Sequence, residues 1–240
     1  MSDSHPPRGA LSSPGRAEVW LAAPSQWLGW RRRTNELDAV ERRRLAELEA
    51  AGPAASRAYA VLHLLARDVV SEQSGTAPAS VAFSRSCDRC GAAHGRPRVL
   101  GQPAVHLSLS RTPDLVAVAL SSDAPVGVDV ERVSSVGFEG FDLVAAHPSE
   151  RLSGRTDTDR AVSWVRKEAA LKALGVGLRI DPETVVTPQP GRPLTLVGTD
   201  SPVSVLDLDP ASVRELARGM VAAVALAAAH ENLVVTLHHR

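Results

Sequence analysis

Two short stretches decide the fold: Gly127-Val128-Asp129-Val130-Glu131 and Trp164-Val165-Arg166-Lys167-Glu168-Ala169-Ala170-Leu171-Lys172. In the first stretch, valines alternate with polar residues and glycine, which is the period of a β-strand that buries one face. We therefore expect Asp129 and Glu131 to lie side by side on the opposite face. Two neighbouring carboxylates repel each other unless a cation lies between them.

The second stretch predicts a helix that begins near Asp157 or Asp159 as N-cap and ends at Gly175. At about 100° per residue, its apolar side chains form one arc, and Glu168 and Lys172 fall inside that arc. A carboxylate on a buried helix face needs a partner, because an unpaired buried charge costs several kcal/mol.

Two interpretations of Glu168 follow from this pattern. Glu168 either pairs with Lys172 one turn later on the same helix, or completes a three-carboxylate site with Asp129 and Glu131. Three oxygen ligands would suit Mg²⁺, which keeps waters that a phosphate substrate can displace. The pattern alone leaves both interpretations open.

Together the two stretches resemble the paired signatures of the 4′-phosphopantetheinyl transferases, in the class that modifies carrier domains of polyketide and nonribosomal peptide synthesis. The resemblance extends from about residue 16 to the C-terminus and includes RAYAVLHLLAR at 57–67, CDRCGAAHGRPRV at 87–99 and HLSLSRTPDLVAVAL at 106–120. It implies a holo-acyl-carrier-protein synthase activity. Such an enzyme moves 4′-phosphopantetheine from coenzyme A to a serine of an apo acyl or peptidyl carrier protein and releases adenosine 3′,5′-bisphosphate.

The resemblance also implies an α+β fold, in which two similar halves are related by a pseudo-twofold axis and each packs a short antiparallel sheet against helices. We expect residues 1–15 to be disordered, residues 16–122 to form the N-terminal half, and residues 123–240 to form the C-terminal half with the metal site. The active site is expected at the seam, near residues 110–131.

Periodicity and turn residues place the remaining elements. Helices are expected at 34–51 with Thr34 as N-cap, at 54–72 and at 138–150. Three strands between 105 and 131 are expected to form an antiparallel meander, and other strands are expected at 18–21, 178–180, 194–197, 203–208, 220–228 and 233–238. Propensity favours a helix for the alanine-rich run 220–229, but the resemblance implies a strand there.

The resemblance assigns the catalytic and metal-binding residues. Asp129, Glu131 and Glu168 would hold Mg²⁺ or Mn²⁺, and Lys167 and Lys172 would neutralise the pyrophosphate of coenzyme A. Lys172 is the stronger candidate of the two lysines because it shares the inward face with Glu168. Either Glu168 or a metal-bound water would accept the proton of the carrier serine.

The same resemblance assigns Arg57, His63, Arg96, Ser110 and Arg111 to coenzyme A binding, together with the two lysines. Arg96 lies in a His-Gly-Arg-Pro segment that is similar to the family's His-Gly-Lys-Pro. At Arg111 the chain departs from its relatives, which carry histidine between Ser110 and the next hydroxyl residue. Arginine is the better bidentate phosphate donor, but it cannot relay a proton at neutral pH.

Composition and charge limit which other classes of function the sequence predicts. Lys and Arg number 27 against 27 Asp and Glu, so no overall charge indicates nucleic-acid binding, and no apolar run is long enough to cross a membrane. Cys87, Cys90 and His94 supply at most three zinc ligands, so we interpret that segment as a loop. Two cysteines in one segment do not form a disulfide framework, which predicts a cytoplasmic location. Arginine clusters at 31–33 and 42–44 are either solvated faces or contacts for an acidic carrier protein. The internal pseudo-dimer predicts a monomer.

Two other functions fit parts of the same pattern. A magnesium-dependent phosphohydrolase could use the same three acids. A non-catalytic module that binds coenzyme A or carrier protein is suggested by the departure at Arg111.

Overall fold

The computed structural model describes residues 14–240 except residues 88, 93–94, 152, 197–200 and 231. Most of the segment that we expected to be disordered, residues 1–13, lies outside the described residues. The first strand, β1 (Gly15–Ala22), begins directly after it. Within the described residues, no helix is long and apolar enough to cross a membrane.

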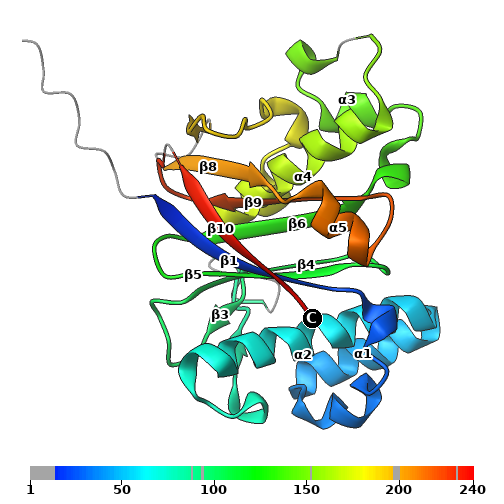
Figure 1. Ribbon diagram of the computed structural model, residues 1–240, viewed down its shortest axis with the longest axis vertical. Coiled ribbons are helices and arrows are strands. Elements are labelled where there is room, and N and C mark those ends of the chain that lie inside the picture. The colour runs from blue at the N-terminus through cyan, green and yellow to red at the C-terminus, as the bar shows by residue number, and fades with distance from the viewer. Residues whose placement is uncertain (1–13, 88, 93–94, 152, 197–200, 231) are drawn as a thin grey trace, which may run out of the picture.

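Two β-sheets lie face to face between outer helices, as Figure 1 shows. The first sheet has the strand order β10-β1-β5-β4-β3-β2 and the second has the order β6-β9-β8-β7. The remaining strands of the first sheet are β2 (Phe83–Ser84), β3 (Arg98–Val99), β4 (His106–Arg111), β5 (Val116–Ser121) and β10 (Leu233–His239). The second sheet contains β6 (Val126–Arg132), β7 (Leu194–Thr195), β8 (Pro202–Asp207) and β9 (Met220–Leu226).

Helix α2 (Pro53–Ser74) lies on the first sheet with α1 (Ala39–Ala51) packed against it, and α4 (Asp157–Leu174) lies on the second (Figure 1). The expected α+β fold with antiparallel sheets is confirmed. One pair differs, because β1 and β10 run parallel. Strand β10 comes from the C-terminal half that we expected, yet it extends the sheet of the N-terminal half, and the division at residue 122 stays a prediction.

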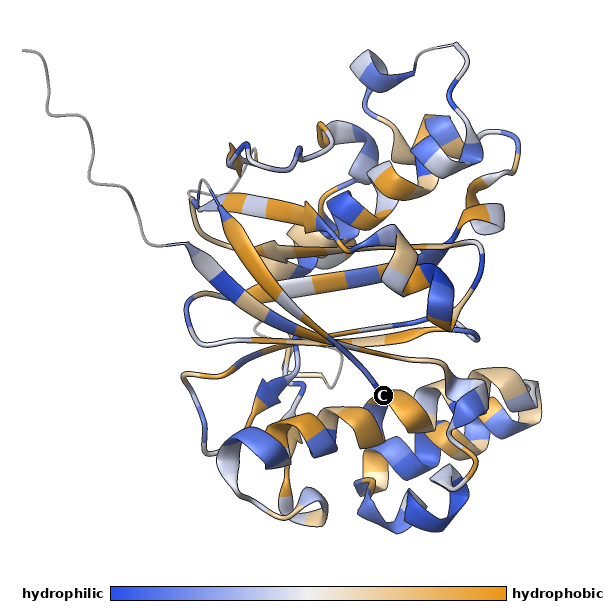
Figure 2. Cartoon of the chain, in the orientation of Figure 1, coloured by the Kyte–Doolittle hydropathy of each residue, from blue (hydrophilic) through white to orange (hydrophobic). Residues whose placement is uncertain are grey.

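Three apolar layers hold this stack together, and most of their residues lie in the strands and on inward faces of the helices (Figure 2). One layer joins α2 to the first sheet, one joins the two sheets, and one joins the second sheet to α4. Strand β9 contributes Ala222, Val224 and Leu226 to the middle layer and Ala223 and Ala225 to the α4 layer. A strand buried on both faces reads as a continuous apolar run, which explains why its alanines form a strand and confirms that prediction.

The expected three-stranded meander is wrong in its last step. Strands β4 and β5 pair antiparallel, but β6 pairs with β9 in the other sheet. Strand β6 is joined to β4 through side chains instead, because the hydroxyls of Ser108 and Ser110 accept hydrogen bonds from the backbone N–H groups of Val128 (3.0 Å) and Val130 (3.2 Å). This seam brings the end of β4 next to Asp129.

Several element boundaries differ from the predictions. Helix α1 begins five residues after Thr34, because Asp38 and Glu41 form a reciprocal capping box, and residues 30–36 form the 3₁₀ helix η2 (Trp30–Glu36). The helix expected at 138–150 is reduced to α3 (Phe141–Ala145) and the 3₁₀ turn η5 (Pro148–Glu150). The strand expected at 178–180 is the 3₁₀ turn η6 (Gly177–Arg179), and the short helix α5 (Pro210–Leu216) was not predicted.

Helix α4 begins and ends where its sequence directs. The N-cap is Thr156, one residue before Asp157, the first of the two predicted candidates. Its hydroxyl accepts a hydrogen bond from the N–H of Asp159, the second candidate. The helix ends at Gly175, which adopts the left-handed conformation (φ 71°) that terminates helices.

Gly127 lets α4 lie directly against β6. A Cβ atom at this position would overlap the backbone oxygen of Ala169 and lie 2.5 Å from the backbone nitrogen of Ala173. Both obstructing atoms belong to backbone, which cannot move aside as a side chain would. Helix and strand therefore approach each other more closely than any other residue at 127 would permit.

Replacing Gly127 with alanine is expected to destabilise the protein by about 3 kcal/mol, because α4 must shift away from the strand. Urea unfolding monitored by circular dichroism would measure the loss. Gly29→Ala is the matched control, because a Cβ there meets nothing within 4 Å and its φ of −93° suits any residue. Equal stability of the two variants would contradict the close approach.

Candidate functional site

A cavity of about 340 Å³ opens where β4, β6 and α4 meet. It contains the two acids of the strand motif, the acid and one lysine of the helix motif, and the hydroxyl and guanidinium at the end of β4. Its lining residues are Leu62, Leu109, Ser110, Arg111, Asp129, Val130, Glu131, Trp164, Glu168, Lys172 and Leu178. The structure thus brings together six of the residues named from the sequence.

Asp129 is the centre of the hydrogen bonding in this cavity. Its side chain is nearly buried, and Oδ1 accepts hydrogen bonds from Ser110 Oγ (2.8 Å) and Lys172 Nζ (2.6 Å). The Lys172 ammonium also donates to the backbone oxygen of Val128 (3.2 Å). Lys172 of α4 therefore forms an ion pair with Asp129 of β6, in place of the pair with Glu168 that the first interpretation expected.

Glu168 faces the same cavity, and its Oε1 is buried without a hydrogen-bond partner in the part of the chain that the structure describes. Burial raises the pKa of Glu168, and the negative charge of Asp129 raises it further, while Lys172 partly offsets the shift. An unsatisfied buried carboxylate oxygen is costly, so a group that satisfies it is expected in the working protein.

Glu131 lies at the more exposed end of β6. Its Oε1 accepts a hydrogen bond from the backbone N–H of Arg132 (2.7 Å), and Arg132 in turn forms an ion pair with Asp114. These contacts fix the carboxylate at the rim of the cavity.

The three carboxylates have the chemistry of a magnesium site, although the described residues contain no preformed cluster of His, Cys, Asp and Glu side chains that could hold an ion. Hard divalent cations prefer carboxylate oxygens, and the unpartnered Oε1 of Glu168 is available to one. We conclude that Asp129, Glu131 and Glu168 fit a Mg²⁺ ion in their donor atoms.

Arg111 stands at the end of β4 with its guanidinium 5.4 Å from the ring centre of Tyr59. Desolvation lowers the pKa of Arg111, and the nearby positive charge of Arg44 adds to the shift. Ser110 beside it is buried and connects Asp129 to the N–H of Val130.

His63 and Arg57 were predicted to approach coenzyme A, but neither lines the cavity. His63 is 6% exposed and lies among charged groups, 3.2 Å from Arg85 and 3.4 Å from Glu41. Burial and the surrounding arginines lower the pKa of His63 well below its usual value, so its imidazole is neutral. Arg57 lies half-buried in the first turns of α2.

Arg96 also has a structural partner in place of the expected phosphate. Its guanidinium donates hydrogen bonds to the backbone oxygens of Lys172, Ala173 and Val126. The positive charge thus lies at the C-terminal end of α4, where the helix dipole is negative. Arg96 ties the loop before β3 to the helix and strand that carry the site.

Lys167 points away from the cavity. Its ammonium is fully buried and donates to Glu150 Oε2 (2.9 Å), to the backbone oxygen of Ala145 (2.7 Å) and to that of Pro182 (3.1 Å). Burial raises the pKa of Glu150, but hydrogen bonds from Thr187 and Lys167 outweigh it and hold that pKa below its usual value. The pair fastens the 140–150 segment to α4, so we correct the assignment of Lys167 to pyrophosphate.

Cys87 lies outside any helix or strand, and Arg89 and Cys90 belong to a turn, in agreement with the predicted loop. Cys87 is half-buried, Cys90 is exposed, and the two are not joined by a disulfide. Backbone hydrogen bonds from Arg89 and Cys90 lower the pKa of Cys87. His94 lies outside the described residues.

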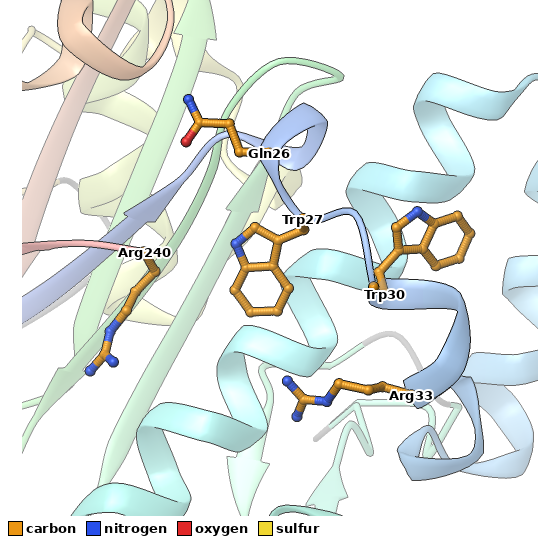
Figure 3. A pocket seen from close by; sticks show the side chains of 6 residues that line it. Gln26, Trp27, Trp30, Arg33 and Arg240 are labelled. Atoms are coloured by element: carbon orange, nitrogen blue, oxygen red, sulfur yellow. The ribbon is translucent and has the colours of Figure 1, made fainter.

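A second cavity, of about 400 Å³, lies far from these acids in the chain and is shown in Figure 3. Trp27 lies there with Arg33 and Arg240, next to Trp30 (Figure 3). Both arginines already bind carboxylates, Arg33 those of Glu36 and Asp68 and Arg240 that of Glu72. This cavity brings together no acid and nucleophile for catalysis.

Sequence reasoning missed the apolar wall of the site and the contact between Arg111 and Tyr59. Leu62, Trp164 and Leu178 line the cavity from α2, α4 and η6. Leu62 and Trp164 fit the apolar periods of their helices, and a helical period does not show which apolar face reaches a cavity. The sequence Pro148-Ser149-Glu150, shortly before α4, is the available signal for the partner of Lys167.

Replacing Lys167 with methionine is expected to destabilise the protein by about 3 kcal/mol, because Glu150 keeps a buried charge without its cation. Chemical unfolding of Lys167→Met, Glu150→Gln and the double variant measures the pair by a double-mutant cycle. A coupling on the order of 2 kcal/mol is expected for contacting groups. Additive effects would show that the two residues do not act as a pair.

The sequence comparisons agree with this geometry. The profile of the 4′-phosphopantetheinyl transferase superfamily matches residues 125–216, which include β6, α4 and therefore all three carboxylates and Lys172. No curated protein was found to match the chain. Over residues 125–216 the chain is therefore similar to the 4′-phosphopantetheinyl transferase superfamily.

Proposed function

We propose that this protein transfers 4′-phosphopantetheine from coenzyme A to a serine of an apo acyl or peptidyl carrier protein, in a reaction that depends on Mg²⁺, with Mn²⁺ as a substitute. The observation that carries the proposal is the convergence of Asp129, Glu168, Lys172 and Arg111 on one cavity, next to a superfamily match that includes the first three. Carrier domains of polyketide and nonribosomal peptide synthesis are the proposed substrates.

The charge of the cavity supports the metal requirement. Three carboxylates and two cations line it, which leaves one net negative formal charge around a site meant for phosphates. A pyrophosphate would be repelled by that charge, whereas a bound divalent cation reverses its sign. Asp129, Glu131 and Glu168 would hold the ion, which supplies neutralisation of the charge that develops on the phosphoryl oxygens.

Three side chains bind the substrate or orient the metal-binding carboxylate. Lys172 holds the pyrophosphate through its ammonium, and Arg111 binds a phosphate oxygen through its fork of N–H donors. Ser110 fixes Oδ1 of Asp129 by its hydrogen bond and so keeps that carboxylate turned into the cavity.

Glu168 is the proposed proton acceptor. Its side chain lines the cavity, and a carboxylate that holds the ion through one oxygen can accept a proton through the other. The serine oxygen forms a bond to the β-phosphorus of coenzyme A, the bond from that phosphorus to the bridging oxygen breaks, and the serine proton passes to Glu168. Adenosine 3′,5′-bisphosphate leaves with the electron pair of the broken bond.

We also propose that the protein acts as a monomer in the cytoplasm, with residues 16–122 and 123–240 as its two halves. The exposed arginines of η2 and α1 support an acidic carrier as partner, although Arg31 and Arg44 already form ion pairs with Glu49 and Glu47.

Intact-protein mass spectrometry of apo carrier proteins, incubated with this protein, coenzyme A and Mg²⁺, tests the proposal. The expected result is a carrier that gains one phosphopantetheine, and EDTA is expected to abolish the gain. Cleavage of coenzyme A without any acceptor would instead indicate a phosphohydrolase. Binding of coenzyme A without modification of any carrier would indicate a binding module.

Glu168→Gln is expected to lower the transfer rate at least 10³-fold, because the amide is neither a base nor a good ligand for a hard cation. The rate is measured as carrier modified per unit time at saturating coenzyme A. Glu183→Gln is the matched control, since Glu183 lies at the surface against Arg151 and its loss should leave the rate unchanged. Similar rates for Glu168→Gln and wild type would remove Glu168 from the mechanism.

A further inference from the structure

Arg111 differs from the other arginines that lie over aromatic rings. The described residues contain four such contacts: Arg31 on Trp30, Arg67 and Arg85 on Phe83, and Arg111 on Tyr59. The first three arginines also bind carboxylates, Arg31 that of Glu49 and the other two that of Glu41. Arg111 has no ion pair within the described part of the chain, so the ring of Tyr59 is its fixed support.

Tyr59 is itself held rigidly. It is 9% exposed, and its ring meets the imidazole of His63 edge-on, with centroids 4.4 Å apart and an interplanar angle of 66°. His63 lies within 3.4 Å of Glu41 and 3.2 Å of Arg85. Because the imidazole of His63 is neutral, it can lie beside Arg67 and Arg85 without charge repulsion.

The charged side chains beneath Tyr59 form ion pairs with one another. Glu41 is fully buried and accepts hydrogen bonds from Arg67 (2.6 Å) and Arg85 (2.5 Å), and Arg85 also lies 3.5 Å from Asp38. None of these carboxylates reaches Arg111. The positive charge of Arg111 therefore stays available to an anion at the cavity.

We propose that Tyr59 is a positioning residue that holds the guanidinium of Arg111 at the mouth of the cavity as a binding group for a phosphate of the substrate. This inference rests on the proposed function and adds a residue to it. A flexible arginine would lose side-chain entropy on each binding event, and a guanidinium already stacked on a buried ring loses less. Tyr59 thus sets affinity for the phosphorylated substrate and leaves the chemical step to other residues.

The test compares Tyr59→Leu and Tyr59→Phe with wild type. Isothermal titration calorimetry measures binding of adenosine 3′,5′-bisphosphate, and the carrier assay gives KM for coenzyme A and kcat. For Tyr59→Leu we expect about fivefold weaker binding and a similar rise in KM with unchanged kcat, the size expected for the cation–π contact of an exposed arginine. Tyr59→Phe keeps the ring and is expected to stay within about twofold of wild type.

Phe83→Leu is the matched control for stability. It removes an aromatic ring from beneath Arg67 and Arg85 in the same network but not from beneath Arg111. We expect a lower melting temperature with unchanged KM. If Tyr59→Leu raised KM no more than Phe83→Leu, or if Tyr59→Phe behaved like Tyr59→Leu, the positioning role would be overturned while transfer by the wild type stood. A wild type that neither binds the nucleotide nor modifies a carrier would overturn the proposed function and the inference with it.

Discussion

The structure depends on the contact between α4 and β6 at Gly127. Because residue 127 has no Cβ, the backbone of Ala169 and Ala173 lies directly on the strand. Asp129 is two residues further along the same face, and Glu168 and Lys172 each precede one of the contacting alanines. The absence of one methyl group therefore sets how far the helix acid and lysine lie from the strand acid.

A second constraint is the seam between the sheets. Strands β4 and β6 are neighbours in space but belong to different sheets, and the hydroxyls of Ser108 and Ser110 replace part of the missing backbone ladder. A short side chain with a hydroxyl can reach the facing N–H, which a larger apolar residue could not satisfy. The seam places Arg111, from the first sheet, at the same cavity as the acids of the second.

Much of this arrangement could be predicted from the sequence where the cause is local. Alternation placed Asp129 and Glu131 on one face of a strand, and the helical period placed Glu168 and Lys172 on the inward face of α4. Neither period gives the partner of a charge when that partner is distant in sequence. Lys167 lies one residue before Glu168, yet its side chain points to a different side of the helix, toward Glu150 and the backbone carbonyl of Ala145. Arg96 is similar, because two of its carbonyl partners lie 76 and 77 residues away and are left without helical partners only once α4 has formed its C-terminus.

Arg111 differs from three cations outside the cavity that the fold already neutralises. Arg67, Arg166 and Lys167 each bind a carboxylate within the fold, so their charges are neutralised before any ligand arrives. Such pairs are hard to break, because each partner would be left as an uncompensated charge. Arg111 is exposed at the end of β4 and lies over the ring of Tyr59 without that compensation. A cation that the fold supports but does not neutralise gains most from an incoming anion, so the arginine at position 111 suits the phosphate-binding role that we propose for it.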